Sequence, residues 1–169
     1  MRKINIICAT ILSALFFACS VSYKFNGATI DYEKVKTISI RDFTNQAELI
    51  YTPLEYNFNE ALRDVYRRQT KLRFVPQNGD LHLEGEIIGY NLTSMGVKDN
   101  DFAATTKLTM TVRVRYTNNA NHNEDFEQTF SAGETFDSSR MLSDVEAELT
   151  EKMVKDIVDM IFNATVANW

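Results

Sequence analysis

One histidine and two glutamates alternate in the stretch LHLEGEII, where His82, Glu84 and Glu86 stand at every second position. In an extended strand these positions share one face, and an imidazole beside two carboxylates can bind a divalent metal or move protons. No serine or cysteine nucleophile motif accompanies them, and the only other histidine, His122, lies in an Asn-rich stretch. We therefore interpret the three residues as the polar face of a strand, and we expect neither a metal site nor an enzyme.

Strict alternation of apolar and polar residues between residues 106 and 116 predicts a strand that is buried on one face. Its polar face carries Lys107, Arg113 and Arg115. Basic side chains match the charge of phosphate groups, and a guanidinium also matches their geometry, so these three are the candidate ligand-binding residues. The alternative is an ordinary solvated face on an open antiparallel sheet.

Another basic set, Arg63, Arg67 and Lys71, is spaced by four residues in a segment with helical periodicity. Like charges at this spacing repel slightly, which a bound anion would relieve. Glu60 and Asp64 lie beside them, however, so a solvated helix face is the better interpretation.

The chain begins with two basic residues and an apolar run, residues 4–18, that is shorter than a membrane-spanning helix. The run ends in LFFACS, where small Ala18 precedes Cys19 as in a bacterial lipobox, although Phe16 and Phe17 depart from the strongest form of that motif. We expect residues 1–18 to be a lipoprotein signal peptide and Cys19 to be the site of lipid attachment. A signal peptide that is cleaved elsewhere, with Cys19 left as a free thiol, is the alternative.

Lipid attachment at Cys19 would divide the chain into residues 19–34, a lipidated N-terminus and short tether, and a single domain over residues 35–169. The other cysteine, Cys8, would be removed, so no intramolecular disulfide is expected. Acyl chains anchor a protein without a transmembrane helix. Since no acidic cluster follows Cys19, we expect the periplasmic leaflet of the outer membrane.

The composition is that of an acidic, folded domain. The formal net charge is −5, and removal of Arg2 and Lys3 with the signal peptide changes it to −7. A chain this acidic lacks the basic face that non-specific nucleic-acid binding requires. With 44% hydrophobic residues, two prolines and six glycines, it is neither disordered nor of low complexity.

The hydrophobic period predicts four strands and two helices. Strands are expected over residues 35–43, 81–92, 106–116 and 126–136, with turns at 76–80 and 117–125, a loop at 94–101 and a bulge at Gly133. Helices are expected over residues 53–72 and from residue 143 to about residue 164, because their apolar residues recur at about 100° per residue. Each helix begins with an apparent capping box, Thr52 with Glu55 and Ser143 with Glu146.

This β-α-β-β-β-α order predicts an α+β fold, with two helices packed on one face of a four-stranded mixed β-sheet. The other sheet face, which carries Lys107, Arg113 and Arg115, would stay open.

Several stretches resemble the LptE family of lipopolysaccharide-assembly lipoproteins: KTISIRDF, NEALRD, RQTKLRFV, NGDLHLEGEIIGY, FEQTFS, DSS and IFNATVANW. The resemblance covers nearly the whole mature chain, is strongest over residues 35–75 and 80–90, and includes Cys19. It implies a fold of two helices on a four-stranded sheet. It also implies a protein that plugs an LptD-type β-barrel, assists its assembly and binds lipopolysaccharide during insertion into the outer leaflet. From the missing catalytic motifs we expect no enzymatic activity, and we expect no cofactor.

Two other functions stay open at this point. A periplasmic lipoprotein that docks on a peptidoglycan synthase and regulates it would need a longer tether than the segment between Cys19 and the first strand. A ligand carrier would need an apolar cavity, and the sequence has no apolar residues beyond those of a single core. The barrel plug is the interpretation that suits a short tether.

Overall fold

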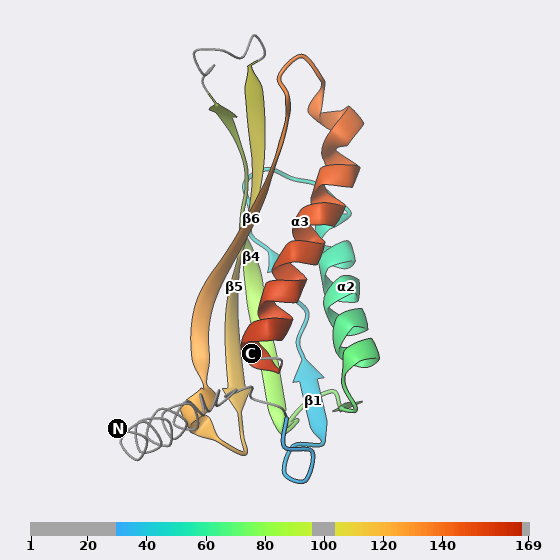
Figure 1. The fold of residues 1–169 in the computed structure, drawn as a ribbon, viewed down its shortest axis with the longest axis vertical. Coiled ribbons are helices and arrows are strands. Elements are labelled where there is room, and N and C mark those ends of the chain that lie inside the picture. The colour runs from blue at the N-terminus through green and yellow to red at the C-terminus, as the bar shows by residue number, and fades with distance from the viewer. Residues whose placement is uncertain (1–29, 96–103, 167–169) are drawn as a thin grey trace, which may run out of the picture.

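The computed structural model describes residues 30–95 and 104–166. Its elements, in chain order, are β1 (Thr37–Ile40), β2 (Thr44–Asn45), α2 (Leu54–Gln69), β3 (Arg73–Phe74), β4 (Leu81–Met95), β5 (Thr105–Asn118), the 3-10 helix η1 (His122–Glu124), β6 (Phe126–Asp137) and α3 (Leu142–Thr165). The molecule is elongated, with the three long strands and α3 running along its length (Figure 1).

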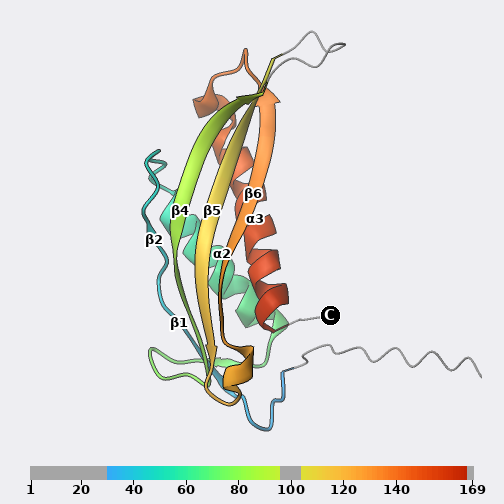
Figure 2. The same cartoon turned by 90° about the vertical axis from the view of Figure 1, so that its left-hand side faces the viewer.

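The strands form one mixed sheet in the order β3-β1-β4-β5-β6, and β2 pairs with β4 beside β1. β1 is parallel to β3 and to β4, and β2 is parallel to β4, whereas β5 is antiparallel to both β4 and β6. Both helices lie behind the same face of this sheet in Figure 2. The predicted α+β fold with two helices on one face of a mixed sheet is therefore confirmed.

The predicted count of four strands is wrong, because the described sheet has six. The extended segment is split: β1 covers only part of the expected strand over residues 35–43, and β2 lies just beyond it at Thr44–Asn45. The two-residue β3 adds a strand after α2. The split occurs where the side chain of Asn59 in α2 takes over the backbone bonds of Phe43. Its Oδ1 accepts the Phe43 N–H at 2.8 Å, and its Nδ2 donates to the Phe43 carbonyl at 3.0 Å.

The three long strands keep the predicted alternation but differ in detail. Buried residues of β5 alternate with polar ones along its whole length. Gly133 pairs in regular register with Thr109, so the predicted bulge at Gly133 is wrong. The irregularity lies instead in β4, between Ile87 and Gly89, just where the pairing with β2 ends. β4 continues to Met95 through the start of the predicted loop, whose remaining residues lie outside the described ones.

Neither predicted capping box forms. α2 has Pro53 at its N-cap and α3 has Met141, both without a side-chain capping bond. The two glutamates bind strands instead: Glu55 accepts the backbone N–H of Asn45 at 3.0 Å, and Glu146 accepts the hydroxyl of Tyr90 at 3.2 Å. Hydrogen bonds to distant strands thus take the place of the bonds at the helix N-terminus that a capping box provides.

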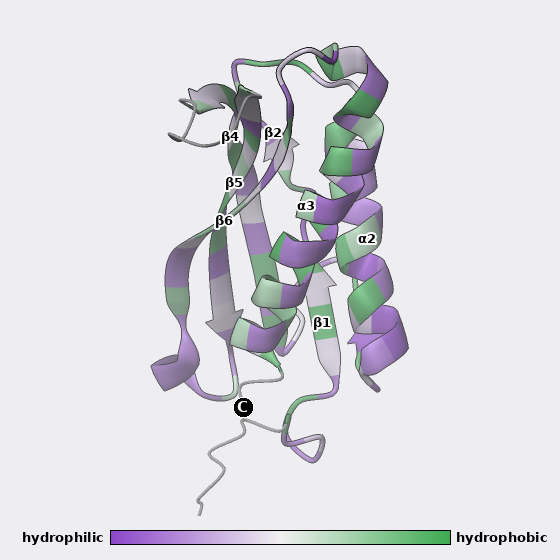
Figure 3. Cartoon of the chain, turned by 45° about the horizontal axis from the view of Figure 1, so that its top comes forward, coloured by the Kyte–Doolittle hydropathy of each residue, from purple (hydrophilic) through white to green (hydrophobic). Residues whose placement is uncertain are grey.

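The core lies between the sheet and the two helices. Phe43 packs on Phe58 with ring centroids 5.3 Å apart, and Tyr66 packs edge-on against Phe162 at 5.2 Å. Hydrophobic and hydrophilic residues alternate along the strands and around the helices in Figure 3. This segregation leaves the sheet face opposite the helices to polar residues.

Candidate functional site: the open face of the sheet

The sheet face turned away from the helices, here called the open face, has two halves that follow from strand register. The charged half lies towards β1 and consists of His82, Glu84, Glu86, Arg113, Arg115 and Glu127, with Arg41 added through its ion pair with Glu84. The hydroxyl half lies towards the far ends of β4 and β5 and consists of Asn91, Thr93, Lys107, Thr109, Thr111, Ser131 and Thr135. All three candidate ligand-binding residues lie on the open face, as expected from their alternation.

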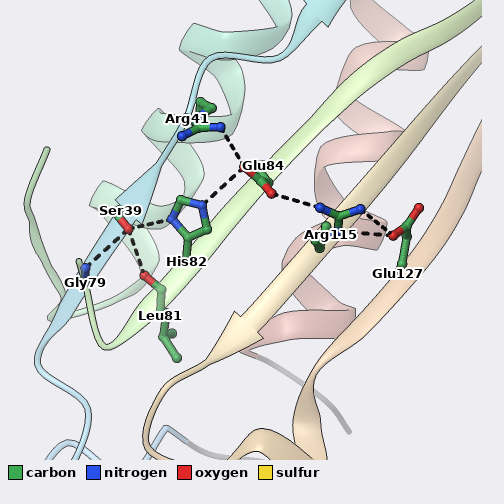
Figure 4. A network of polar contacts seen from close by, with 8 residues as sticks. All are labelled: Ser39, Arg41, Gly79, Leu81, His82, Glu84, Arg115 and Glu127. Carbon is green, nitrogen blue, oxygen red and sulfur yellow. Dashed lines mark hydrogen bonds and ion pairs between the residues drawn. The ribbon is translucent and has the colours of Figure 1, made fainter. Parts of the chain in front are cut away.

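A ladder of ion pairs crosses the charged half (Figure 4). Glu84 accepts from Arg41 at 3.0 Å and from Arg115 at 3.3 Å, and Arg115 also donates to Glu127 at 2.9 Å. The hydrogen bond and charge of Glu127, and then the charge of Glu84, raise the pKa of Arg115 above its ordinary value. The groove over this ladder has a volume of about 350 Å³. Its charges are neutralised within the protein itself.

The structure separates Lys107 from the two arginines. Arg113 donates to Glu86 at 2.7 Å, so both arginines would have to give up carboxylate partners to bind an anion. Lys107 makes no ion pair with any residue of the described ranges. It is six residues from Arg113 along β5, or roughly 20 Å at the rise of a strand. The three residues therefore do not surround one phosphate group.

Gly133 makes room for the lysine. A Cβ atom on Gly133 would come within 2.5 Å of the Lys107 Cε, so the aliphatic part of Lys107 lies across this glycine. No sequence pattern indicates this contact, because it depends on the register between β5 and β6.

His82 links β1 to the ladder (Figure 4). Its Nδ1 is 2.8 Å from the Ser39 Oγ, and its Nε2 is 3.4 Å from Glu84. A serine, a histidine and a carboxylate in contact are the components of a hydrolase triad. Ser39 is only 1% exposed, however, and its Oγ also accepts the Gly79 N–H at 3.3 Å, so a substrate has no access to it. The contacts instead hold β1 against β4.

The described residues contain no group of three His, Cys, Asp or Glu side chains arranged to hold a metal ion. Glu86 faces Arg113 rather than His82. The strand interpretation of residues 82–86 therefore agrees with the geometry.

The basic residues of the first helix segment do not form one anion site. Arg63 pairs with Asp42 and Glu60, and Arg67 lies near Asp64. Lys71 follows the end of α2, and its Nζ lies 5.9 Å from the centre of the Tyr32 ring. We conclude that this surface is solvated and locally neutralised.

Cys19, the predicted site of lipid attachment, lies outside the described residues. Within the described ranges, neither helix combines the length and the apolar character needed to cross a bilayer.

Two helices over one face of a mixed sheet, with a polar open face whose arginines are paired with carboxylates, define a two-layer α+β protein. The model of the LptE family, described as lipopolysaccharide-assembly, matches residues 35–165. The chain belongs to the LptE family, which confirms the resemblance seen in its sequence.

Solved structures share the fold at low sequence identity. Rare lipoprotein B from Shewanella oneidensis is 13% identical with a TM-score of 0.50, over 75% of this chain and 92% of that chain. The PelC dodecamer from Paraburkholderia phytofirmans is 11% identical with a TM-score of 0.50, over 83% of this chain and 95% of that chain. No curated protein sequence matches this chain. These similarities concern the fold alone.

Proposed function

We propose that this chain is an outer-membrane lipoprotein that plugs an LptD-type β-barrel, assists its assembly and takes part in inserting lipopolysaccharide into the outer leaflet. The observation that carries the proposal is the match of the lipopolysaccharide-assembly family over residues 35–165. Lipid attachment at Cys19 would hold the protein at the periplasmic leaflet of the outer membrane.

The open face supports the role of a plug. The lumen of a large transmembrane barrel is polar, so a plug must present hydrogen-bonding groups while keeping its apolar residues for its own core. The hydroxyl half offers such groups, and the charged half adds ion pairs that are already satisfied. Apart from Lys107, such a surface meets a polar wall without burying a charge that is unpaired among the described residues.

Lys107 is the leading candidate for contact with lipopolysaccharide. Its ammonium group has no carboxylate partner in the described part of the chain, so a phosphate group would not compete with an existing ion pair. Arg113 and Arg115 are secondary candidates, because a phosphate would first have to displace Glu86 or Glu127.

A pull-down of the tagged lipoprotein from outer membranes in mild detergent, followed by mass spectrometry, tests the proposal. We expect a large β-barrel protein to be recovered at close to one copy per lipoprotein. Recovery of a peptidoglycan synthase in that ratio would favour the regulatory alternative, and recovery of no stoichiometric partner would contradict the plug.

A further inference from the structure

The far part of β4 has, in the described part of the chain, no strand on one of its sides. β1 pairs with β4 from Leu81 to Leu83, and β2 pairs at Glu86 and Ile87. Among the described residues, no strand continues this pairing towards Met95. β4 runs well past β1 and β2 in Figure 2. We call residues 91–95 the distal edge of β4.

Hydrogen bonds of the paired part show which peptide groups point away from β5. The carbonyls of Leu83 and Ile87 accept backbone N–H groups of the β1–β2 segment at 2.9 and 2.8 Å. These two residues lie opposite Tyr116 and Val112, which are even-numbered residues of β5. In an antiparallel pair, the peptide groups of alternate residues point towards the partner strand and away from it. The β4 residues opposite even-numbered β5 residues therefore point their peptide groups outward.

Leu92 and Ser94 belong to this outward set. Leu92 lies opposite Leu108, and Ser94 lies opposite Thr106, in the register that follows the irregularity of β4. Their N–H and C=O groups thus face the distal edge rather than the ladder with β5. They are the donors and acceptors that an added strand would use.

The side chains of this edge lack the usual protection against pairing. Exposed sheet edges are normally guarded by charged residues or proline. The free edge of β6 carries three acidic residues, Glu127, Glu134 and Asp137, whereas the sequence NLTSM of the distal edge has neither charge nor proline. Leu92 is 43% exposed and Met95 45%. The distal edge is therefore uncharged, exposes two apolar side chains and is open to pairing.

We propose that the distal edge of β4 accepts an extended strand of the partner protein, which adds to the sheet beside Leu92 and Ser94. This inference rests on the proposed function, since the partner is the barrel protein. A second copy of this chain is a poor occupant, because two five-residue strands bury far less than the roughly 1,200 Å² of a stable interface. The barrel protein, by contrast, would also contact the rest of the plug surface and so bury a larger area.

Charge also favours a particular kind of strand. Tyr90, which precedes Leu92 on the helix side of β4, donates to the carboxylate of Glu146. An added strand with an apolar residue facing Leu92 and a basic rather than an acidic residue near Glu146 complements this edge.

Two substitutions at one position test the proposal in the full-length lipoprotein. Ser94→Pro removes an outward N–H without removing a hydrogen bond to β5, and Ser94→Ala keeps that N–H. We expect Ser94→Pro to weaken barrel binding about fivefold, as the loss of one backbone hydrogen bond does, and Ser94→Ala to leave it unchanged. Binding is measured by titrating the purified barrel protein against each variant in detergent.

A covalent readout complements the titration. p-Benzoylphenylalanine in place of Leu92 should cross-link to one strand of the barrel protein on illumination, and the same probe at exposed Tyr56 in α2 serves as the control. Equal affinities for Ser94→Pro and Ser94→Ala, or no cross-link from position 92, would overturn the strand-addition proposal. The proposed function would still stand in that case, provided that the wild-type protein binds the barrel. Failure of the wild type to bind the barrel would overturn both.

If Ser94→Pro lacks a cooperative unfolding transition, it is not properly folded, and a further variant is used in its place. Leu92→Lys changes an exposed side chain and leaves every backbone group in place. Strand addition would bury part of the new charge, so this variant should also bind about fivefold more weakly. Unchanged affinity would overturn the proposal.

Discussion

Asp80 ties the start of β4 to the start of β1. One of its carboxylate oxygens accepts the backbone N–H groups of Lys36 and Thr37 at 2.8 and 2.9 Å and the Thr37 hydroxyl at 2.8 Å. The bonds from the Lys36 N–H and the Thr37 hydroxyl, in that order, lower the pKa of Asp80 below its ordinary value. The ionised carboxylate is therefore the form that the folded protein stabilises.

Asp80→Asn should lower the free energy of unfolding by about 1–2 kcal/mol at neutral pH, because an amide accepts these bonds less well than a carboxylate. The folded pKa is lower than the unfolded one, so the contribution of Asp80 is present above about pH 4 and is lost as pH falls through the folded pKa. Urea unfolding at pH 7 and at pH 2–3 measures it. The difference between the proteins should shrink at the lower pH, and exposed Glu33→Gln is the control.

Lys107 is the residue on which the proposed contact with lipopolysaccharide depends most. Lys107→Met keeps the length of the side chain over Gly133 and removes the charge, so it should weaken lipopolysaccharide binding about fivefold. The matched control is Lys152→Met on α3, whose ammonium is paired with Glu148 at 2.7 Å. Equal losses in a binding titration of the two variants would contradict a specific role of Lys107.

Gly85 shows how one element depends on another. A Cβ atom there would collide with the carbonyl oxygen of Arg113 in β5 and with the ring of Phe43, which packs over the strand. Gly89 in the same strand is less crowded, because its Cβ would meet the nearest atoms, on Asn91 and Thr111, at 3.2 and 3.3 Å.

Gly85→Ala should therefore destabilise the protein by about 3 kcal/mol, the upper range for overpacking against a rigid neighbour. Gly89→Ala should cost much less, about 1 kcal/mol or below, because side chains can shift. Thermal or urea denaturation of both variants measures the difference. A similar cost at the two sites would show that Phe43 and β5 give way more easily than their packing indicates.

The long elements were predictable and the short ones were not. β5 and the two helices carry repeated apolar residues over many turns or pairs, and that repetition outweighs local exceptions. β2 and β3 have two residues each, too few for any period. β2 pairs with β4 and β3 pairs with β1, so both pairings depend on segments that are distant in the sequence.

The whole molecule has two distinct ends. The first described residues lie at one end, and the distal edge of β4 lies at the other (Figure 1). An anchor at Cys19 would therefore hold the first end towards the membrane and present the opposite end to a partner.

Cys19→Ala should release the protein from the membrane fraction of a strain that lacks the barrel, since acyl chains would then provide the only attachment. In a strain that contains the barrel, the variant should stay with the barrel through protein contacts. Fractionation and immunoblotting of both strains measure this. An unlipidated variant that remains fully membrane-bound without the barrel would contradict the anchor.

The sequence by itself determined the long strands, the two helices, the polar open face and the family, because each of these is repeated over many residues. Only the tertiary structure decided which charged side chains on that face form ion pairs within the protein. Arg113 and Arg115 find carboxylates across neighbouring strands, while Lys107 lies over Gly133 without one among the described residues. Cross-strand partners are set by register, which arises from the packing of distant segments and leaves no local mark in the sequence.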